Sequence, residues 1–267
     1  MASLLKYDGI KFENGSVTEI TDPITVEKAL QISINGKSFT VVMQTPGHEV
    51  ELGLGLLYSE DIITTSTKYT YDLKLDDSDT VEIIDFKIAE SDLGKGYLSS
   101  RSLLSVSSCG ICGKQSLDDI QSGGSALKDG ITQVDSQFIF SLQRIMQNSQ
   151  TIFPDTGSTH GAALFNKNGQ LLVCREDIGR HNALDKSIGH LIINKQLKEA
   201  DILFFSGRIS YEIVIKSFRA KIKLIIAISA PSSLAIDYAK EFGIDLIGYC
   251  RNTKFTCYTN PKFLNSK

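Results

Sequence analysis

Two cysteines, Cys109 and Cys112, stand two residues apart in a segment rich in glycine and serine that ends on Lys114. Two sulfurs at this spacing can form a disulfide, provide half of a metal site, or pass a sulfur atom from one partner to another. Gly110 and Gly113 permit backbone angles that other residues avoid, and this favours a mobile loop over a buried staple. We therefore expect thiol chemistry in this segment.

The neighbouring sequence separates the possible thiol chemistries. A closed structural zinc site needs a second pair of ligands, but Cys174, Cys250 and Cys257 are isolated. A thioredoxin-like site would start a helix, and the glycines disfavour one there. A zinc deaminase carries proline before its cysteine pair and a His-x-Glu motif, whereas Ser108 stands in the proline position and His160 has no glutamate at the required offset. An exposed cysteine beside a lysine fits a persulfide carrier.

Composition excludes several classes of protein. With 267 residues, 42% hydrophobic and 22% charged, the chain is long and apolar enough for a folded protein of one or two domains. A net charge of −3 provides no basic field for a large nucleic-acid surface. We expect no signal peptide in residues 1–11 and no membrane span, because no apolar run is long enough. Five cysteines do not resemble a secreted disulfide framework, so we expect a cytoplasmic protein with Cys109 and Cys112 as thiols.

The first part, residues 1–125, is predicted to be a strand-rich α+β unit that ends after the cysteine segment. Asn35-Gly36 lies between two strand-like segments, 31–34 and 37–43, and predicts a tight hairpin. A helix over 48–57, where Gly53 and Gly55 permit close packing, and a strand over 81–88 complete this part. The boundary is placed at the glycine- and serine-rich residues 121–125.

The second part, residues 126–267, is predicted to be an α/β core with a mostly parallel sheet flanked by helices. Three apolar strands separated by helices imply parallel strands joined by right-handed crossovers. The expected helices span 136–146, 182–193, 211–220 and 233–242, and the expected strands span 162–165, 171–174, 202–205, 224–228 and 246–250.

Three strands of this core are followed by residues suited to an anion. Residues 206–210 and 229–233 are small and polar and lead directly into helices, whose N-termini carry unpaired N–H groups and a partial positive charge. The third strand leads into Arg251 and Lys254, which adds two cations at the same edge. Serine and proline also simply start helices. The three turns together favour a phosphate or pyrophosphate ligand at this edge.

A run of charged residues, 175–186, follows the strand that ends at Cys174. Such a run is usually a solvated helix start, which is how this one is interpreted when taken alone. The alternative is a polar network built around a ligand. His160 opens a strand, and a lone histidine is more often a hydrogen-bonded structural residue than a catalyst.

Taken together, these motifs resemble the FdhD family, the formate dehydrogenase accessory sulfurtransferases, over nearly the whole chain. Two positions depart from the family pattern, since Gln44 replaces a common arginine and Ser158 replaces a glycine before the histidine. The segments that carry the resemblance are Val26-Glu27, Ile34-Asn35-Gly36, Met43-Gln44-Thr45-Pro46-Gly47, Glu51-Leu52, Leu54-Gly55, residues 107–114, residues 175–186, Ser206-Gly207-Arg208 and residues 229–235.

The resemblance implies a sulfurtransferase that accepts persulfide sulfur from a cysteine desulfurase. It passes the sulfur to the bis-guanine-dinucleotide form of the molybdenum cofactor, which formate dehydrogenase then receives. A cytidine-deaminase-like core and a homodimer are also implied, with no tightly bound metal. Cys109 corresponds to the persulfide-bearing residue and Cys112 to the second thiol. The cofactor-binding stretch corresponds to Tyr249, Cys250, Arg251, Asn252, Thr253 and Lys254.

Two other functions remain open at this point. One is a chaperone that binds the nucleotide cofactor without carrying sulfur, and the transfer of labelled sulfur would separate it from a carrier. The other is a zinc-dependent, deaminase-like hydrolase, which metal analysis of the purified protein would reveal.

Overall fold

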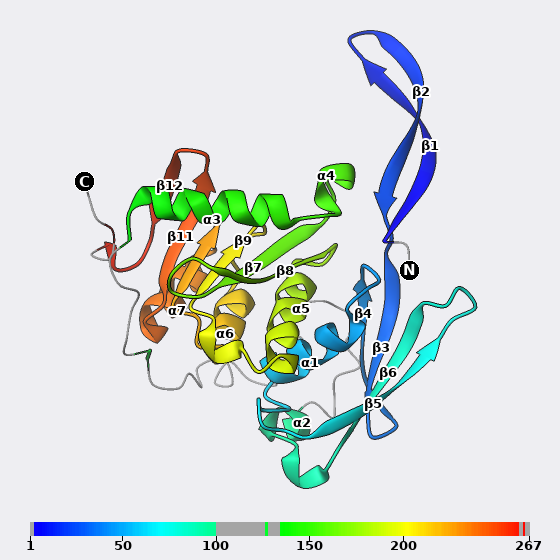
Figure 1. Ribbon diagram of the computed structural model, residues 1–267, viewed down its shortest axis with the longest axis vertical. Helices are drawn as coiled ribbons and strands as arrows, with labels where there is room; N and C mark the ends of the chain where they lie inside the picture. The colour runs from blue at the N-terminus through cyan, green and yellow to red at the C-terminus, as the bar shows by residue number, and fades with distance from the viewer. Residues whose placement is uncertain (1–2, 100–125, 128–133, 262–263, 265–267) are drawn as a thin grey trace.

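The computed structural model describes residues 3–99, 126–127, 134–261 and 264, and its largest unit is a six-stranded sheet (Figure 1). The strand order is β12-β11-β10-β9-β7-β8. The central strands β9, β10 and β11 are parallel, as the sequence predicts. The strands span β7 (His160–Phe165), β8 (Leu171–Asp177), β9 (Ile202–Phe205), β10 (Leu224–Ala227), β11 (Asp245–Arg251) and β12 (Lys254–Cys257).

The complete sheet is mixed rather than mostly parallel. Strands β8 to β11 run in one direction and β7 and β12 in the other, so three of the five pairings, β7–β8, β7–β9 and β11–β12, are antiparallel. The reason is that the β7–β8 hairpin joins the sheet through β7, while β12 folds back on β11. The prediction of a deaminase-like core stays a prediction.

Helices cover both faces of this sheet (Figure 1). Ile202 and Phe204 of β9 pack against α3 (Ser136–Ser149), whereas Leu203 and Phe205 point to the opposite face. That face is covered by α5 (Arg180–Ile193), α6 (Tyr211–Arg219) and α7 (Ser233–Phe242). A strand that is apolar on both sides is typical of a sheet between two helical layers. None of the helices in the described ranges is long and apolar enough to cross a membrane.

A second, four-stranded sheet has the order β4-β3-β6-β5. Asn35 and Gly36 have φ angles of 52° and 76°, so the predicted tight hairpin between β3 and β4 is confirmed. Helix α1 (Glu49–Ser59) packs on one face of the sheet, where Phe86 lies against Gly53. The strands span β3 (Lys28–Ile34), β4 (Lys37–Gln44), β5 (Tyr69–Leu75) and β6 (Val81–Ile88).

Helices α1 and α5 connect the two units through close backbone contact. A Cβ atom at Gly55 would overlap the backbone oxygen of Asp185, and one at Gly189 would overlap the backbone oxygen of Glu51. Only glycine fits at such an approach. Helix α5 is thus fixed against α1, and its first turn lies at the candidate site.

Residues 4–25 form an arm that projects from the body and that the sequence analysis does not anticipate (Figure 1). Among the described strands, β1 (Leu4–Glu13) and β2 (Ser16–Thr25) pair only with each other. At the base of the arm, the hydroxyls of Thr25 and Ser158 lie 2.6 Å apart. The remaining short elements are the helices α2 (Lys95–Ser99) and α4 (Phe153–Thr156) and the 3₁₀ turns η1 (Glu90–Asp92) and η4 (Leu197–Glu199).

Candidate functional site

The carboxyl ends of β8, β9, β10 and β11 lie at one edge of the large sheet, where α5, α6 and α7 begin; we call this the carboxyl edge. The turns after these strands contact one another. Ile209 N donates to Ala230 O at 3.0 Å, and Tyr249 N donates to Ser229 O at 3.1 Å. The structure therefore brings together the three turns that the sequence places at a ligand-binding edge.

Residues 249–254 form the end of β11 and the turn into β12. Tyr249 has a φ of 52° beside an irregularity in the β11–β12 register, and the residue is 46% exposed. A bulky residue in the left-handed region is strained, and such strain often occurs at functional sites. Arg251 Nε donates to Ile228 O at 3.3 Å, and the side chains of Asn252 and Lys254 are exposed. This stretch presents one aromatic ring and two cations.

Cys250 differs from its neighbours in this stretch because it faces the core. Its side chain is fully buried against α3, with Sγ 3.9 Å from Gln143 Oε1. Burial raises the pKa of this thiol to about 12. The part of Cys250 that a ligand at the carboxyl edge could meet is its backbone.

The other described cysteines are also poor nucleophiles. Burial, together with the charge of Glu176, raises the pKa of Cys174 to about 12. Burial raises the pKa of Cys257 as well, and its Sγ lies 2.8 Å from Thr259 O. Thiols of this kind are protonated at neutral pH and therefore inert. Cys109 and Cys112 lie outside the described residues.

Most of the charged run 175–186 is buried, so the interpretation of a solvated helix start is wrong. Asp177 and Lys186 are 0% and 1% exposed and form an ion pair of 2.7 Å. Asp177 also accepts hydrogen bonds from Thr45 N at 3.0 Å, Gly179 N at 2.7 Å and Asn182 Nδ2 at 3.0 Å. Of these partners, Thr45 lies outside the run, in the segment between β4 and α1, and the sequence of the run alone does not indicate this contact.

Two further ion pairs link α5 and β8 to neighbouring elements. Lys216 of α6 donates to both carboxylate oxygens of Asp185 at 2.7 Å. Arg175 Nε donates to Glu51 of α1 at 2.6 Å, and His190 lies 2.9 Å from the same carboxylate. Burial alone would raise the pKa of Glu51, but hydrogen bonds from Arg175, His48 and His190 hold that pKa well below its usual range. We call these three pairs the buried ion-pair network.

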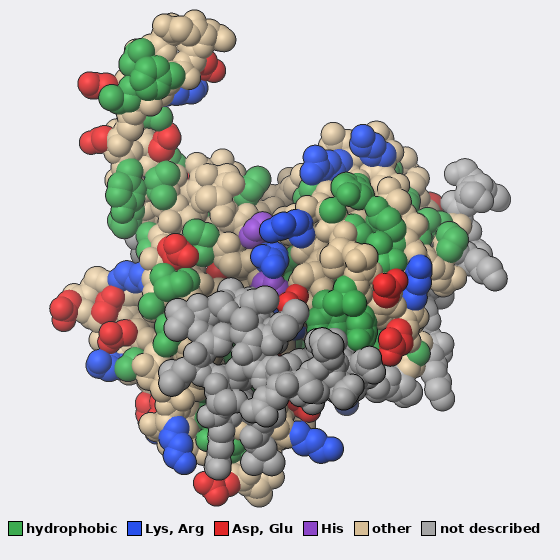
Figure 2. Space-filling model, turned by 180° about the vertical axis from the view of Figure 1, so that it is seen from behind, with side chains coloured by type: hydrophobic (Ala, Val, Ile, Leu, Met, Phe, Trp, Pro, Cys, Tyr) green, Lys and Arg blue, Asp and Glu red, His purple; other side chains and the backbone are tan. Residues whose placement is uncertain are grey.

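A second group of charged and polar side chains lies at the carboxyl edge itself, and we call it the histidine–arginine cluster. Its members come from the start of β7, the first turn of α5 and the end of β9. In space-filling view, histidine and basic side chains gather near the middle of one face of the molecule (Figure 2). The members are His160, Arg180, His181, Ser206 and Arg208.

The two histidines of this cluster are held neutral. Burial, followed by the charges of Lys216 and Arg180, lowers the pKa of His181 to about 3. Burial and the charges of Arg180 and Arg208 also lower the pKa of His160. At neutral pH the positive charge of the cluster therefore belongs to its two arginines.

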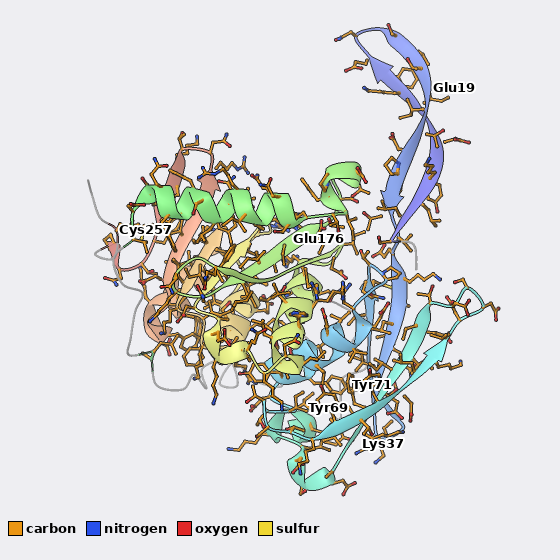
Figure 3. All side chains as sticks on the ribbon, viewed as in Figure 1. Glu19, Lys37, Tyr69, Tyr71, Glu176 and Cys257 are labelled. Carbon is orange, nitrogen blue, oxygen red and sulfur yellow. The ribbon has the colours of Figure 1, made fainter. Side chains whose placement is uncertain are left out.

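Glu176 holds the segment that leads into His160 (Figure 3). Its carboxylate accepts hydrogen bonds from Ile152 N at 2.9 Å, Phe153 N at 2.8 Å and Thr159 Oγ1 at 2.8 Å. A carboxylate at the first N–H groups of α4 is a favourable cap. The start of β7, and with it His160, is fixed by a residue of β8.

Sequence reasoning treats His160 as structural and does not connect it with Arg180, His181 or Arg208. The sequence feature that could have connected these residues is their position after the strands of the large sheet. The motifs Ser206-Gly207-Arg208 and Gly179-Arg180-His181 both follow strands that end at the same edge. Within the described parts of the chain, no group of three or more histidine, cysteine or acidic side chains is arranged to hold a metal ion.

Comparison with known proteins adds independent findings. The model of the FdhD/NarQ family matches residues 25–265. The chain is 38% identical over 254 residues to the "Sulfur carrier protein FdhD" of Sulfolobus acidocaldarius, covering 94% of this chain and 95% of that protein. It is 35% identical over 257 residues to the protein of the same name from Streptomyces coelicolor, covering 93% of this chain and 91% of that protein.

A solved structure is similar in fold. A crystal structure assigned as a formate dehydrogenase accessory protein from Desulfotalea psychrophila superposes with a TM-score of 0.76. The match covers 99% of this chain and all of the other, at 21% sequence identity. This likeness supports the arrangement of sheets and helices described above.

Proposed function

The chain belongs to the FdhD/NarQ family, and from this membership we propose that it is a sulfur carrier in the maturation of formate dehydrogenase. The observation that carries the proposal is the identity of 38% over 94% of the chain to a protein named as a sulfur carrier. The alternative is a chaperone that binds the cofactor and carries no sulfur. It predicts the same binding of the cofactor but no transfer of sulfur to it.

We propose that Cys109 carries the sulfur as a persulfide. Its thiolate attacks the outer sulfur of a persulfide on a cysteine desulfurase, the donor S–S bond breaks, and the donor cysteine leaves as a thiolate. The sulfur changes partner without net oxidation or reduction. Support comes from the described cysteines 174, 250 and 257, whose raised thiol pKa values disfavour the thiolate that this step requires. Cys112 is proposed as the second thiol of the pair.

The proposed acceptor is the guanine-dinucleotide molybdenum cofactor, bound as a substrate at the carboxyl edge. The exposed ring of Tyr249 can stack on a guanine base, and Arg251 and Lys254 can pair with its phosphates. Asn252 and Thr253 present polar side chains in the turn between them. Formate dehydrogenase is the proposed recipient, a homodimer the proposed assembly and the cytoplasm the proposed compartment.

Mass spectrometry tests the carrier function. After incubation with a cysteine desulfurase and cysteine, the wild type should gain the mass of one sulfur atom, and Cys109→Ala should not. Cys257→Ala is the matched control, because its thiol is half-buried and hydrogen-bonded, and this variant should load like the wild type. Transfer of labelled sulfur to the cofactor in a single turnover separates a carrier from a chaperone. Loading and delivery by Cys109→Ala would contradict the assignment.

A further inference from the structure

The two arginines of the histidine–arginine cluster have no acceptor among the residues that the structure describes. In the described ranges, neither Arg180 nor Arg208 makes a salt bridge or a side-chain hydrogen bond. Arg180 Nε is buried without an acceptor among those residues. A buried polar group without a partner is costly, more so when it is charged. The position therefore suits an acceptor that comes from a ligand.

The first turn of α5 adds further unpaired donors at the same place. Its first intrahelical hydrogen bond runs from Ala183 N to Gly179 O at 3.0 Å. The backbone N–H groups of Arg180, His181 and Asn182 precede this bond and donate to no acceptor among the described residues. The first turn contains no acidic residue. The positive end of this 14-residue helix thus points to the edge where both arginines lie.

His160 is linked to the end of β9 by its Nδ1 atom. Ser206 Oγ accepts from Gly161 N at 2.9 Å and lies 3.3 Å from His160 Nδ1. The hydroxyl of Ser206 can donate to Nδ1 or accept from it. The other ring nitrogen, Nε2, makes no hydrogen bond to the described residues.

One carboxylate near the cluster, Asp177, is already paired with Lys186 at 2.7 Å, although its charge acts on His160. Glu212 of α6 interacts electrostatically with Arg180 and His181. The donors at this edge that have no acceptor among the described residues are the two guanidinium groups and the first N–H groups of α5. Such a set matches the several acceptor oxygens of a phosphate group.

We propose that the histidine–arginine cluster is an anion subsite that binds a phosphate or pyrophosphate group, separate from residues 249–254. The inference rests on the proposed function, because a dinucleotide substrate would supply the group. Strand β10 separates β9 from β11, so the ends of these two strands lie about 10 Å apart. One extended ligand can reach both subsites along the carboxyl edge.

Isothermal titration of the full-length chain tests this subsite, with inorganic pyrophosphate and GDP as separate probes. Combining Arg180→Gln with Arg208→Gln should weaken pyrophosphate binding by about tenfold or more, because two charge-assisted contacts are lost. The exposed Arg144 on α3 provides the control, and Arg144→Gln should bind like the wild type. Combining Arg251→Gln with Lys254→Gln should weaken GDP binding and leave pyrophosphate binding within about twofold of the wild type.

Single and conservative variants keep the test independent of folding. Arg208 is exposed, so Arg208→Gln alone should keep the thermal unfolding of the wild type and still bind pyrophosphate more weakly. Arg180→Lys should bind more tightly than Arg180→Gln, because it retains the charge. The inference is overturned if the wild type does not bind pyrophosphate, or if the doubly substituted cluster binds it as tightly as the wild type.

Sulfur loading separates this inference from the proposed function. The cluster variants should still take up one sulfur atom from a desulfurase, because Cys109 is unchanged. If the wild type takes up no sulfur, the carrier function fails whatever the pyrophosphate titration gives. If loading is normal and pyrophosphate affinity is unchanged in the cluster variants, the subsite alone is wrong.

Discussion

The buried ion-pair network and the histidine–arginine cluster both include residues of the charged segment 175–186, yet charges are paired in the first and unpaired in the second. Asp177 and Lys186 are buried and paired at 2.7 Å. Arg180, between them in sequence, has no ion-pair partner in the described structure. The difference follows from position. The paired charges lie between packed elements, whereas Arg180 lies where α5 begins at the carboxyl edge.

The comparison indicates that burial of charge has two uses in this protein. Between elements, the network joins segments far apart in the chain: the ion pair of Glu51 and Arg175 spans 124 residues, and the hydrogen bond from Thr45 N to Asp177 spans 132. Removing one partner of such a pair leaves a buried charge without compensation. At the edge, the two arginines form no ion pair with the described residues, so their removal should affect binding and not folding. Three stability measurements test this division.

The largest effect is expected for Lys186→Met. The substitution leaves the carboxylate of Asp177 buried without its cation, which typically costs about 3–5 kcal/mol in the free energy of unfolding. Urea unfolding of the wild type and the variant measures the difference. The control is Lys74→Met, because Lys74 pairs with Glu82 while both side chains are largely exposed. It should lose no more than about 1 kcal/mol. Equal losses of unfolding free energy in the two variants would contradict the structural role of the buried pair.

A smaller effect, visible only in acid, is expected for His181→Gln. The folded pKa of His181, about 3, lies below the 6.5 of an ordinary histidine, so the unfolded state binds the proton first as the pH falls. Its contribution is present above pH 6.5 and is lost as the pH falls toward 3. Between about pH 7 and about pH 4 the wild type should therefore lose about 3 kcal/mol more than the variant. Parallel stability profiles would show that His181 is not held neutral.

The elements of the second half could be predicted because their side chains are buried in regular patterns. The run Leu224 to Ala227 is apolar on both faces, and the helix over 233–242 has the bounds that its pattern predicts. The arm escaped prediction because its strands bury almost nothing. Phe12 is 76% exposed and Ile10 is 62% exposed, so no division into a buried and a polar face marks them as strands.

The candidate site was predicted only where the signal is local. Three turns at the ends of successive strands identify the carboxyl edge, because the order of parallel strands brings them together. The partners of residues 175–186 could not be foreseen, since Gln44 and Thr45 reach Lys186 across more than 140 residues. Gln44, which departs from the family pattern, accepts from Lys186 at 3.2 Å and so belongs to the buried network.

The smallest effect on folding is expected where charge is unpaired. Arg180→Gln removes a cation that has no ion pair in the described structure, and it also relieves the unpaired, buried Nε. The loss of this costly group should offset the lost packing of the arginine stem against Gly207, so the free energy of unfolding should change by less than about 1 kcal/mol. Urea unfolding at neutral pH, without added anions, measures it. Repeating the measurement with pyrophosphate should stabilise the wild type more than the variant, because a ligand stabilises the state that binds it. A loss as large as that of Lys186→Met would mean that Arg180 is structural, and the distinction between the two groups of charge would not hold.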